Sequence, residues 1–249
     1  MSGHSKWATI KRKKAKVDSA RAVVFQRYSR ELMVAAKLGG ADPSANFRLR
    51  TAIDRAKAAG LPQDNIKRAI DKGAGMQDSG NYEELTYEGY GAGGVAIFIE
   101  VMTDNRNRTA GDIRSYFTKY NGNLGSDGCV AWMFKPVGVL TFGEDTDLNA
   151  LFEQAIELGV EDIMEEEEGC RITTSFENFQ FIVEGLEATG FKANCAELTR
   201  IPENTVEITD EKVAKQVLQL IEKIEDQDDV QNVYANFEIA DEILEKLDL

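Results

Sequence analysis

The sequence is poor in the residues on which most catalytic and metal-binding chemistry depends. Its 249 residues include one histidine, His4, and three cysteines. A Ser-His-Asp or Cys-His nucleophile would have to use that one histidine, and a zinc or iron site built from several histidines is excluded. Cys129, Cys170 and Cys195 are odd in number and lack the spacing of a zinc motif. We therefore expect free thiols in a reducing compartment, and neither a metal nor another cofactor.

Long hydrophobic runs are also absent. No apolar stretch approaches the roughly 18 residues that a membrane-spanning helix requires. Residues 1–16 are basic and lack the apolar core of a signal peptide, so we expect a cytoplasmic protein with no membrane partner. A Walker A motif is missing as well. Residues 89–94 match G-x-G-x-x-G, but a strand-like run follows them instead of a helix, so the match predicts a glycine-rich turn.

The charge of the chain is distributed unevenly along it. Residues 1–79 contain 17 Lys and Arg against 7 Asp and Glu, a net charge of +10, whereas residues 80–249 carry −24. Together the two parts give the −14 of the whole chain. This asymmetry indicates a segment that faces nucleic acid, joined to an acidic body. The Gly- and Ser-rich stretch 72–80 has no periodicity and predicts a linker between them.

The basic residues are densest near the N-terminus. Each lysine or arginine that neutralises a phosphate releases counterions, so this density favours a nucleic-acid partner over a merely solvated tail. Trp7 lies in the same segment, where it would either stack on a base or ribose or pack as an anchor of a helical core. The candidate nucleic-acid-binding residues are His4, Ser5, Lys6, Trp7, Lys11, Arg12, Lys13, Lys14, Lys16, Arg21, Arg27 and Arg30.

Hydrophobic periodicity predicts three helices within residues 1–79. The first helix ends at Gly39-Gly40, the second follows Asp42-Pro43-Ser44, and the third begins near Pro62. Gly73 is suited to a left-handed conformation at the end of the third helix. Three short helices predict a small bundle with a modest core.

Strands and helices alternate in the acidic body. Residues 95–101 form a continuous apolar run that is typical of a buried strand. Residues 137–201 show the element order β-α-β-β-α-β of a ferredoxin-like domain. The last helix and strand, within residues 213–237, cannot bury themselves alone. We therefore expect them to return to the sheet of residues 82–128.

The predicted fold class is α+β, with an N-terminal three-helix domain followed by two α/β domains, the third ferredoxin-like and inserted into the second. The predicted boundaries are 1–79 for the basic helical domain, 80–134 plus 203–249 for the discontinuous α/β domain, and 135–202 for the inserted domain.

A second group of cations follows the buried strand. Residues 103–109, Thr-Asp-Asn-Arg-Asn-Arg-Thr, predict the start of a helix with Thr103, Asp104 or Asn105 as its N-cap. Arg106 and Arg108 would either hold a phosphate or carboxylate at this helix start or pair with neighbouring carboxylates. The sequence leaves both alternatives open.

Five blocks of the sequence resemble the YebC/PmpR family. They are GHSKW at 3–7, LPQDNI at 61–66, YEGYG at 87–91, TDNRNRT at 103–109 and EDQDDVQNVY at 225–234. The blocks occur in order and cover nearly the whole chain. The sequence departs from the family pattern at three positions. Phe47 stands where the family often has proline, Cys129 where it often has serine, and Gln227 where it often has an apolar residue.

The resemblance implies three domains and no enzymatic activity. It implies a probable DNA-binding transcriptional regulator, or alternatively a translation factor that binds ribosomal RNA and relieves stalling at proline-rich stretches. No helix-turn-helix recognition helix with base-reading side chains stands out in the sequence. We therefore expect the basic N-terminal domain to bind mainly the phosphate backbone, with a strong dependence on salt.

Overall fold

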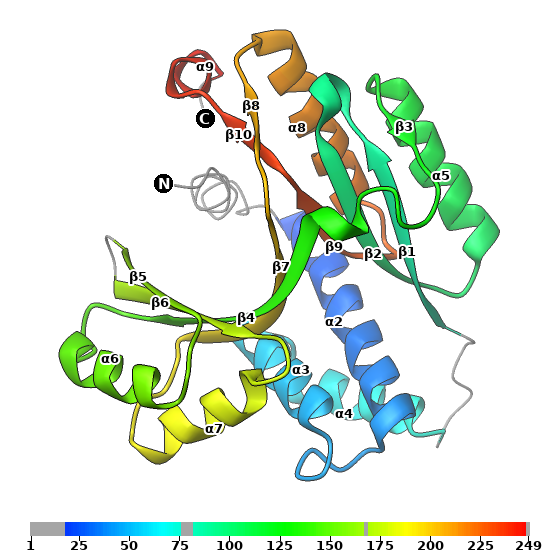
Figure 1. The fold of residues 1–249 in the computed structure, drawn as a ribbon. Coiled ribbons are helices and arrows are strands. Elements are labelled where there is room, and N and C mark those ends of the chain that lie inside the picture. The colour runs from blue at the N-terminus through cyan, green and yellow to red at the C-terminus, as the bar shows by residue number, and fades with distance from the viewer. Residues whose placement is uncertain (1–17, 76–81, 167–168, 248–249) are drawn as a thin grey trace. The chain divides into compact units, whose positions relative to one another are not determined.

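The computed structural model describes residues 18–75, 82–166 and 169–247 (Figure 1). It contains two compact units. The first is formed by Met1–Phe134 together with Pro202–Leu249, and the second by Lys135–Ile201. Within the described ranges, no helix is long and apolar enough to cross a membrane.

The described residues in the N-terminal part of the first unit form three helices, as predicted from the sequence. They are α2 (Asp18–Gly39), α3 (Phe47–Ala58) and α4 (Gln63–Gly73). Their shared core is small because most of its buried side chains are alanine. The buried members are Leu32, Ala35, Ala36, Leu49, Ala52, Ala56, Leu61, Ile66 and Ala69.

The buried side chain of Asn46 fixes the connection between α2 and α3. Its Oδ1 accepts a hydrogen bond from the backbone N–H of Leu49 at 3.0 Å and thereby caps α3. Its Nδ2 donates to the carbonyl oxygens of Ala35 and Gly40, at 2.9 and 2.8 Å. One side-chain amide therefore satisfies backbone groups at the end of one helix and the start of the next.

Gly73 is needed for a reason other than the predicted one. It is the last residue of α4 and does not have a positive φ, whereas Gly75 does, at 81°. A Cβ placed on Gly73 would lie 2.1 Å from the carbonyl oxygen of Met33 in α2. The prediction of a left-handed Gly73 was therefore wrong. Glycine is required here because the backbones of α2 and α4 approach too closely for a side chain.

The rest of the first unit is built on an antiparallel sheet with the strand order β3-β1-β2-β9. The strands are β1 (Glu83–Tyr90), β2 (Ala96–Thr103), β3 (Asn123–Leu124) and β9 (Val230–Ala235). The predicted glycine-rich turn joins β1 to β2, with Gly93 and Gly94 at positive φ. Its central residues form the short helix η1 (Ala92–Gly94). The pairing of β2 with β9 confirms that the C-terminal segment returns to this sheet.

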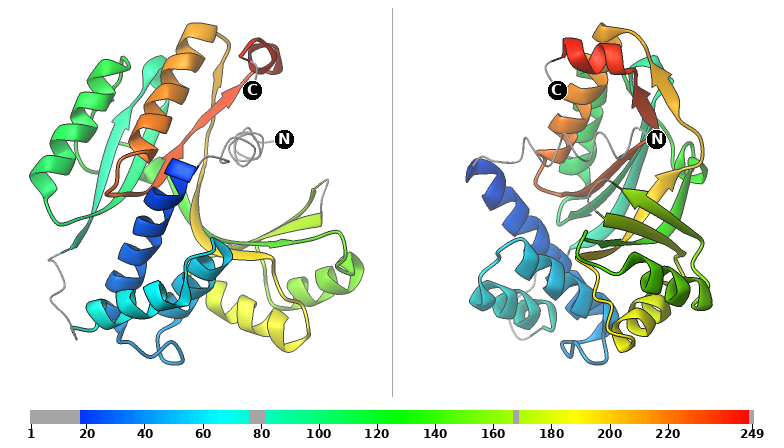
Figure 2. Two further views of the ribbon diagram at one scale, coloured as in Figure 1. Left: turned by 180° about the vertical axis from the view of Figure 1, so that it is seen from behind. Right: turned by 90° about the vertical axis from the view of Figure 1, so that its left-hand side faces the viewer.

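Helices α5 (Arg106–Lys119) and α8 (Glu211–Glu225) cover one face of the sheet (Figure 2). The main core lies between them and the strands and includes Ile97, Ile99, Val101, Ile113, Phe117, Val217, Leu220 and Ile224. A second apolar cluster contains Phe98, Val130 and Phe134. The remaining elements of this unit are η2 (Ala131–Met133), β8 (Val206–Ile208), β10 (Phe237–Ile239) and α9 (Asp241–Lys246).

The second unit has the ferredoxin-like arrangement that the sequence predicts. Its elements are β4 (Phe134–Phe142), α6 (Leu148–Glu157), β5 (Asp162–Glu166), β6 (Gly169–Ser175), α7 (Phe179–Ala188) and β7 (Cys195–Pro202). The sheet order is β5-β6-β4-β7, so the first strand of the unit lies between its third and fourth strands. The α+β fold class is therefore confirmed, whereas the three-domain boundaries stay a prediction.

Two glycine substitutions test the close approach of α2 and α4. We expect Gly73→Ala to lower the free energy of unfolding by about 2 kcal/mol, because the added methyl group displaces the backbone of Met33. Gly111→Ala is the matched control, since Gly111 lies inside α5 with open space around it. It should raise stability by about 0.5–1 kcal/mol. Urea denaturation measures both changes. Equal effects of the two substitutions would contradict the close approach of α2 and α4 at Gly73.

Candidate nucleic-acid interface

Most of the predicted nucleic-acid-binding residues lie outside the described residues. These are His4, Ser5, Lys6, Trp7, Lys11, Arg12, Lys13, Lys14 and Lys16. Arg21 belongs to α2. Arg27 and Arg30 lie further along the same helix, and their guanidinium groups contact the protein itself.

Arg27 and Arg30 attach α2 to the turn between α8 and β9. Arg27 Nη2 donates to the carbonyl oxygen of Glu225 at 2.7 Å. Burial is the main influence on Arg27 and lowers its pKa, although the nearby carboxylate of Glu225 opposes this shift. Arg30 Nη2 lies 3.7 Å from Oδ1 of Asp229, and its guanidinium lies 6.0 Å from the ring centroid of Tyr82. Both arginines thus have a structural role, and their binding of nucleic acid stays a prediction.

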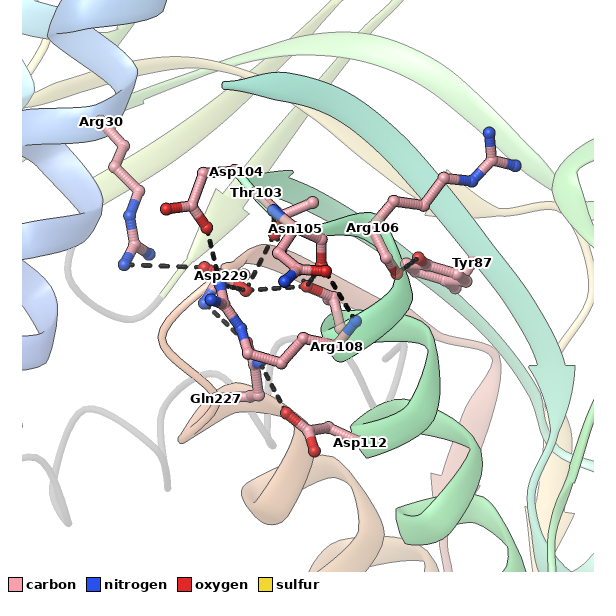
Figure 3. A network of polar contacts seen from close by, with 11 residues as sticks. Arg30, Tyr87, Thr103, Asp104, Asn105, Arg106, Arg108, Asp112, Gln227 and Asp229 are labelled. Carbon is pink, nitrogen blue, oxygen red and sulfur yellow. Dashed lines mark hydrogen bonds and ion pairs between the residues drawn. The ribbon is translucent and has the colours of Figure 1, made fainter. Parts of the chain in front are cut away.

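The carboxylate of Asp229 is the centre of a polar network (Figure 3). Its side chain is only 3% exposed. Its Oδ2 accepts hydrogen bonds from Thr109 Oγ1 at 2.7 Å, Arg108 Nη2 at 2.8 Å and Thr103 Oγ1 at 3.1 Å. Burial alone would raise the pKa of Asp229, but these three hydrogen bonds together outweigh it and hold the pKa below its ordinary value. Asp229 is therefore ionised at neutral pH.

Two further side chains hold the backbone around this carboxylate. Asn105 Oδ1 accepts a hydrogen bond from the N–H of Arg108 at 3.1 Å, which confirms it as the N-cap of α5 among the three predicted candidates. Gln227 Oε1 accepts from the N–H of Asp229 at 2.6 Å, and Gln227 Nε2 donates to Asp112 at 3.4 Å. Gln227, one of the three positions at which the sequence departs from the family pattern, thus supports Asp229 directly.

Arg106 and Arg108 lie in the same helical turn but differ in their contacts. Arg108 donates to Asp104 at 2.9 Å as well as to Asp229, and these hydrogen bonds, first of all that to Asp229, raise its pKa. Arg108 therefore pairs with neighbouring carboxylates, which is the second of the two alternatives. The guanidinium of Arg106 points away from the network and forms no ion pair with a described residue. Binding of an anion by Arg106 stays a prediction.

The cations of the helical bundle separate into two groups. Arg48 pairs with Glu84, and Arg55 pairs with Glu31 at 3.0 Å. Across the described ranges, the exposed bundle cations without an ion pair are Lys37, Lys57, Lys67 and Arg68. The high charge density near the N-terminus does not point to this second group. The available signal was their position outside the apolar stripe of each helix.

A groove with a volume of about 520 Å³ lies between α3 and α4. Its lining combines isoleucine side chains with charges of both signs. The isoleucines are Ile53, Ile66 and Ile70, and the charged residues are Arg50, Lys57, Lys67, Asp54 and Asp71. The sequence did not predict this groove, because it depends on the packing of one helix against another.

The described residues offer little for metal binding or for catalysis by a thiol. No group of three or more His, Cys, Asp or Glu residues is placed there to hold a metal ion. Cys129, Cys170 and Cys195 are free thiols. Burial raises the pKa of Cys129 and of Cys170, so both thiols stay protonated and weakly reactive at neutral pH.

Comparisons with known proteins agree on one family. Residues 5–76 match the model of the TACO1/YebC protein N-terminal domain, and residues 82–237 match that of the TACO1/YebC second and third domain. The chain is 53% identical to a "Probable transcriptional regulatory protein" of Geotalea uraniireducens over 99% of this chain and 100% of the relative. It is 49% identical to the "Probable transcriptional regulatory protein FN1661" of Fusobacterium nucleatum, over the full length of both.

A solved structure is similar as well. The crystal structure of a conserved hypothetical protein from Aquifex aeolicus shares 46% sequence identity with this chain and superimposes with a TM-score of 0.82. The match covers 93% of this chain and 96% of that one.

Replacing Asp229 tests the network. We expect Asp229→Asn to lower the free energy of unfolding by about 3 kcal/mol at pH 7, because the charges of Arg30 and Arg108 lose their shared partner. The ionised carboxylate stabilises the fold above its unfolded-state pKa of about 4, and this contribution disappears as pH falls through the lower native pKa. The difference between wild type and variant should therefore shrink below about pH 4.

The adjacent Asp228 supplies a matched control for this experiment. It is exposed and forms no ion pair within the described residues, so Asp228→Asn should change stability by less than about 0.5 kcal/mol. Chemical denaturation between pH 3 and 7 measures both variants. If the loss of stability in Asp229→Asn does not depend on pH, Asp229 is not stabilised in its ionised form by this network.

Proposed function

The chain belongs to the TACO1/YebC family, and we propose that it is a non-enzymatic regulator of gene expression whose basic N-terminal domain binds the phosphate backbone of DNA. The observation that carries this proposal is the charge of residues 1–79, +10 within a chain of −14. Like-charged side chains at this density bind a polyanion by releasing its counterions. The names of the relatives, probable transcriptional regulatory proteins, support a role in transcription.

The proposed contacts lie at and just before the start of α2. They are His4, Ser5, Lys6, Trp7, Lys11, Arg12, Lys13, Lys14, Lys16 and Arg21. Arg27 and Arg30 complete the proposed set, and in addition they position α2 against the Asp229 turn. The protein acts in the cytoplasm, where its three free thiols stay reduced.

The competing hypothesis is a ribosome-associated translation factor. The same cations would then contact the phosphates of ribosomal RNA, because electrostatic binding of a backbone does not distinguish DNA from RNA. Crosslinking in cells, followed by sequencing of the bound nucleic acid, separates the two hypotheses. Enriched promoter DNA supports the regulator, whereas predominantly ribosomal RNA contradicts it.

Neutralising the N-terminal cations tests the assignment of the interface. We expect replacement of five of them by glutamine to weaken binding of a 20-base-pair DNA duplex about a hundredfold or more at 100 mM salt. The slope of log K against log salt should fall by about 4, because each lost phosphate contact removes about 0.9. The replaced residues are Lys11, Arg12, Lys13, Lys14 and Lys16.

A control variant carries the same change in total charge at other sites. It replaces five exposed lysines outside the helical bundle by glutamine, namely Lys119, Lys192, Lys212, Lys223 and Lys246. Fluorescence anisotropy over a salt series measures both variants. An unchanged slope in the N-terminal variant, or the same decrease in both, would overturn the proposed interface.

A further inference from the structure

The groove between α3 and α4 is lined by three kinds of chemical groups. Ile53, Ile66 and Ile70 provide an apolar surface. Lys57 and Lys67 provide positive charge. Asp54 and Asp71 provide carboxylates, which accept hydrogen bonds. A ligand for this groove has to satisfy all three kinds of group.

The two lysines are available to a ligand. Lys57 and Lys67 are exposed, and neither forms an ion pair with any residue that the structure describes. Asp71 follows Lys67 by one helical turn, yet no ion pair joins them. Arg48 and Arg55, in contrast, are engaged with Glu84 and Glu31. The groove thus holds free cations in a bundle whose arginines largely hold the protein together.

An unpaired nucleotide meets the three requirements. Its base has an apolar face that packs on aliphatic side chains, and its exocyclic amino groups donate hydrogen bonds to carboxylates. Its phosphate binds lysine. A base within a duplex cannot use the groove in this way, because its faces are stacked on the neighbouring bases and cannot pack on the isoleucine side chains. The volume of about 520 Å³ is within the range of small-ligand sites.

We propose that the groove between α3 and α4 binds an unpaired nucleotide of the nucleic acid that the N-terminal segment holds. The proposal rests on the proposed function and adds a structural class of target, a nucleic acid with a loop, bulge or single-stranded end. Lys57 and Lys67 contact the flanking phosphates, and Asp54 or Asp71 accepts from the base. The N-terminal cations provide affinity for any backbone, whereas the groove selects for the unpaired base.

The test compares a hairpin that has an unpaired loop with a fully paired duplex of the same stem, each made as DNA and as RNA. We expect the full-length protein to bind the looped form about tenfold more tightly than the duplex for at least one of the two sugars. Lys57→Gln with Lys67→Gln should remove this preference and leave duplex affinity within about threefold of wild type. Lys37→Gln with Lys72→Gln changes the charge equally outside the groove lining and should keep the preference.

Photo-crosslinking locates the bound base independently of affinity. A 5-iodocytosine placed in the loop keeps the exocyclic amino group that the carboxylates would accept from, and it should crosslink within residues 47–73, the span of α3 and α4. Equal loss of the preference in both lysine pairs, or crosslinks confined to other residues, would overturn the inference. If the protein binds the duplex and shows no preference for the loop, the inference about the groove is wrong, whereas the proposed function is not contradicted. Failure to bind any of the probes refutes the proposed function itself.

Discussion

The burial of one carboxylate constrains the arrangement of the first unit. An ionised Asp229 is unstable in a protein interior unless several donors surround it. The donors come from separate segments, because Thr103 ends β2, Thr109 and Arg108 begin α5, and Arg30 belongs to α2. The helical bundle and the strand–helix corner must therefore meet the α8–β9 turn at the same point. Because Arg30 and Arg108 form ion pairs with Asp229, their guanidinium groups are less available to a ligand.

The distinction between arginine and lysine within the bundle follows from the same physical chemistry. The planar guanidinium forms directed contacts in partly buried places, as Arg27, Arg30 and Arg55 do. The compact, strongly hydrated ammonium of lysine stays in water, as at Lys57 and Lys67. Net charge along the sequence therefore overstates how many cations a polyanion can reach. The charge that matters for binding is what remains after the fold has formed its own ion pairs.

Features that depend on neighbouring residues could be predicted from the sequence, and features that depend on distant contacts could not. The three helices, the glycine-rich turn and the ferredoxin-like order follow from periodicity and turn residues within short windows. The hydrogen bonds of Asp229 join residues 120 to 126 positions apart, and no local pattern encodes them. Gly73 does not adopt the left-handed conformation predicted for it, and the approach of Met33 that requires glycine there is visible only in the packed bundle. The groove between α3 and α4 escaped prediction for the same reason.

The insertion of residues 135–201 has a consequence for the order in which the chain folds. Strand β2 cannot pair with β9 until the inserted residues have been synthesised and the ends of the insertion lie close together. A hydrogen bond of 2.9 Å from the N–H of Glu203 to the carbonyl oxygen of Met133 joins the chain on either side of it. Because a ferredoxin-like unit that is already compact shortens the loop to be closed, its formation lowers the entropic barrier to the long-range strand pairing. We therefore expect the acidic insertion to fold before β2 and β9 pair.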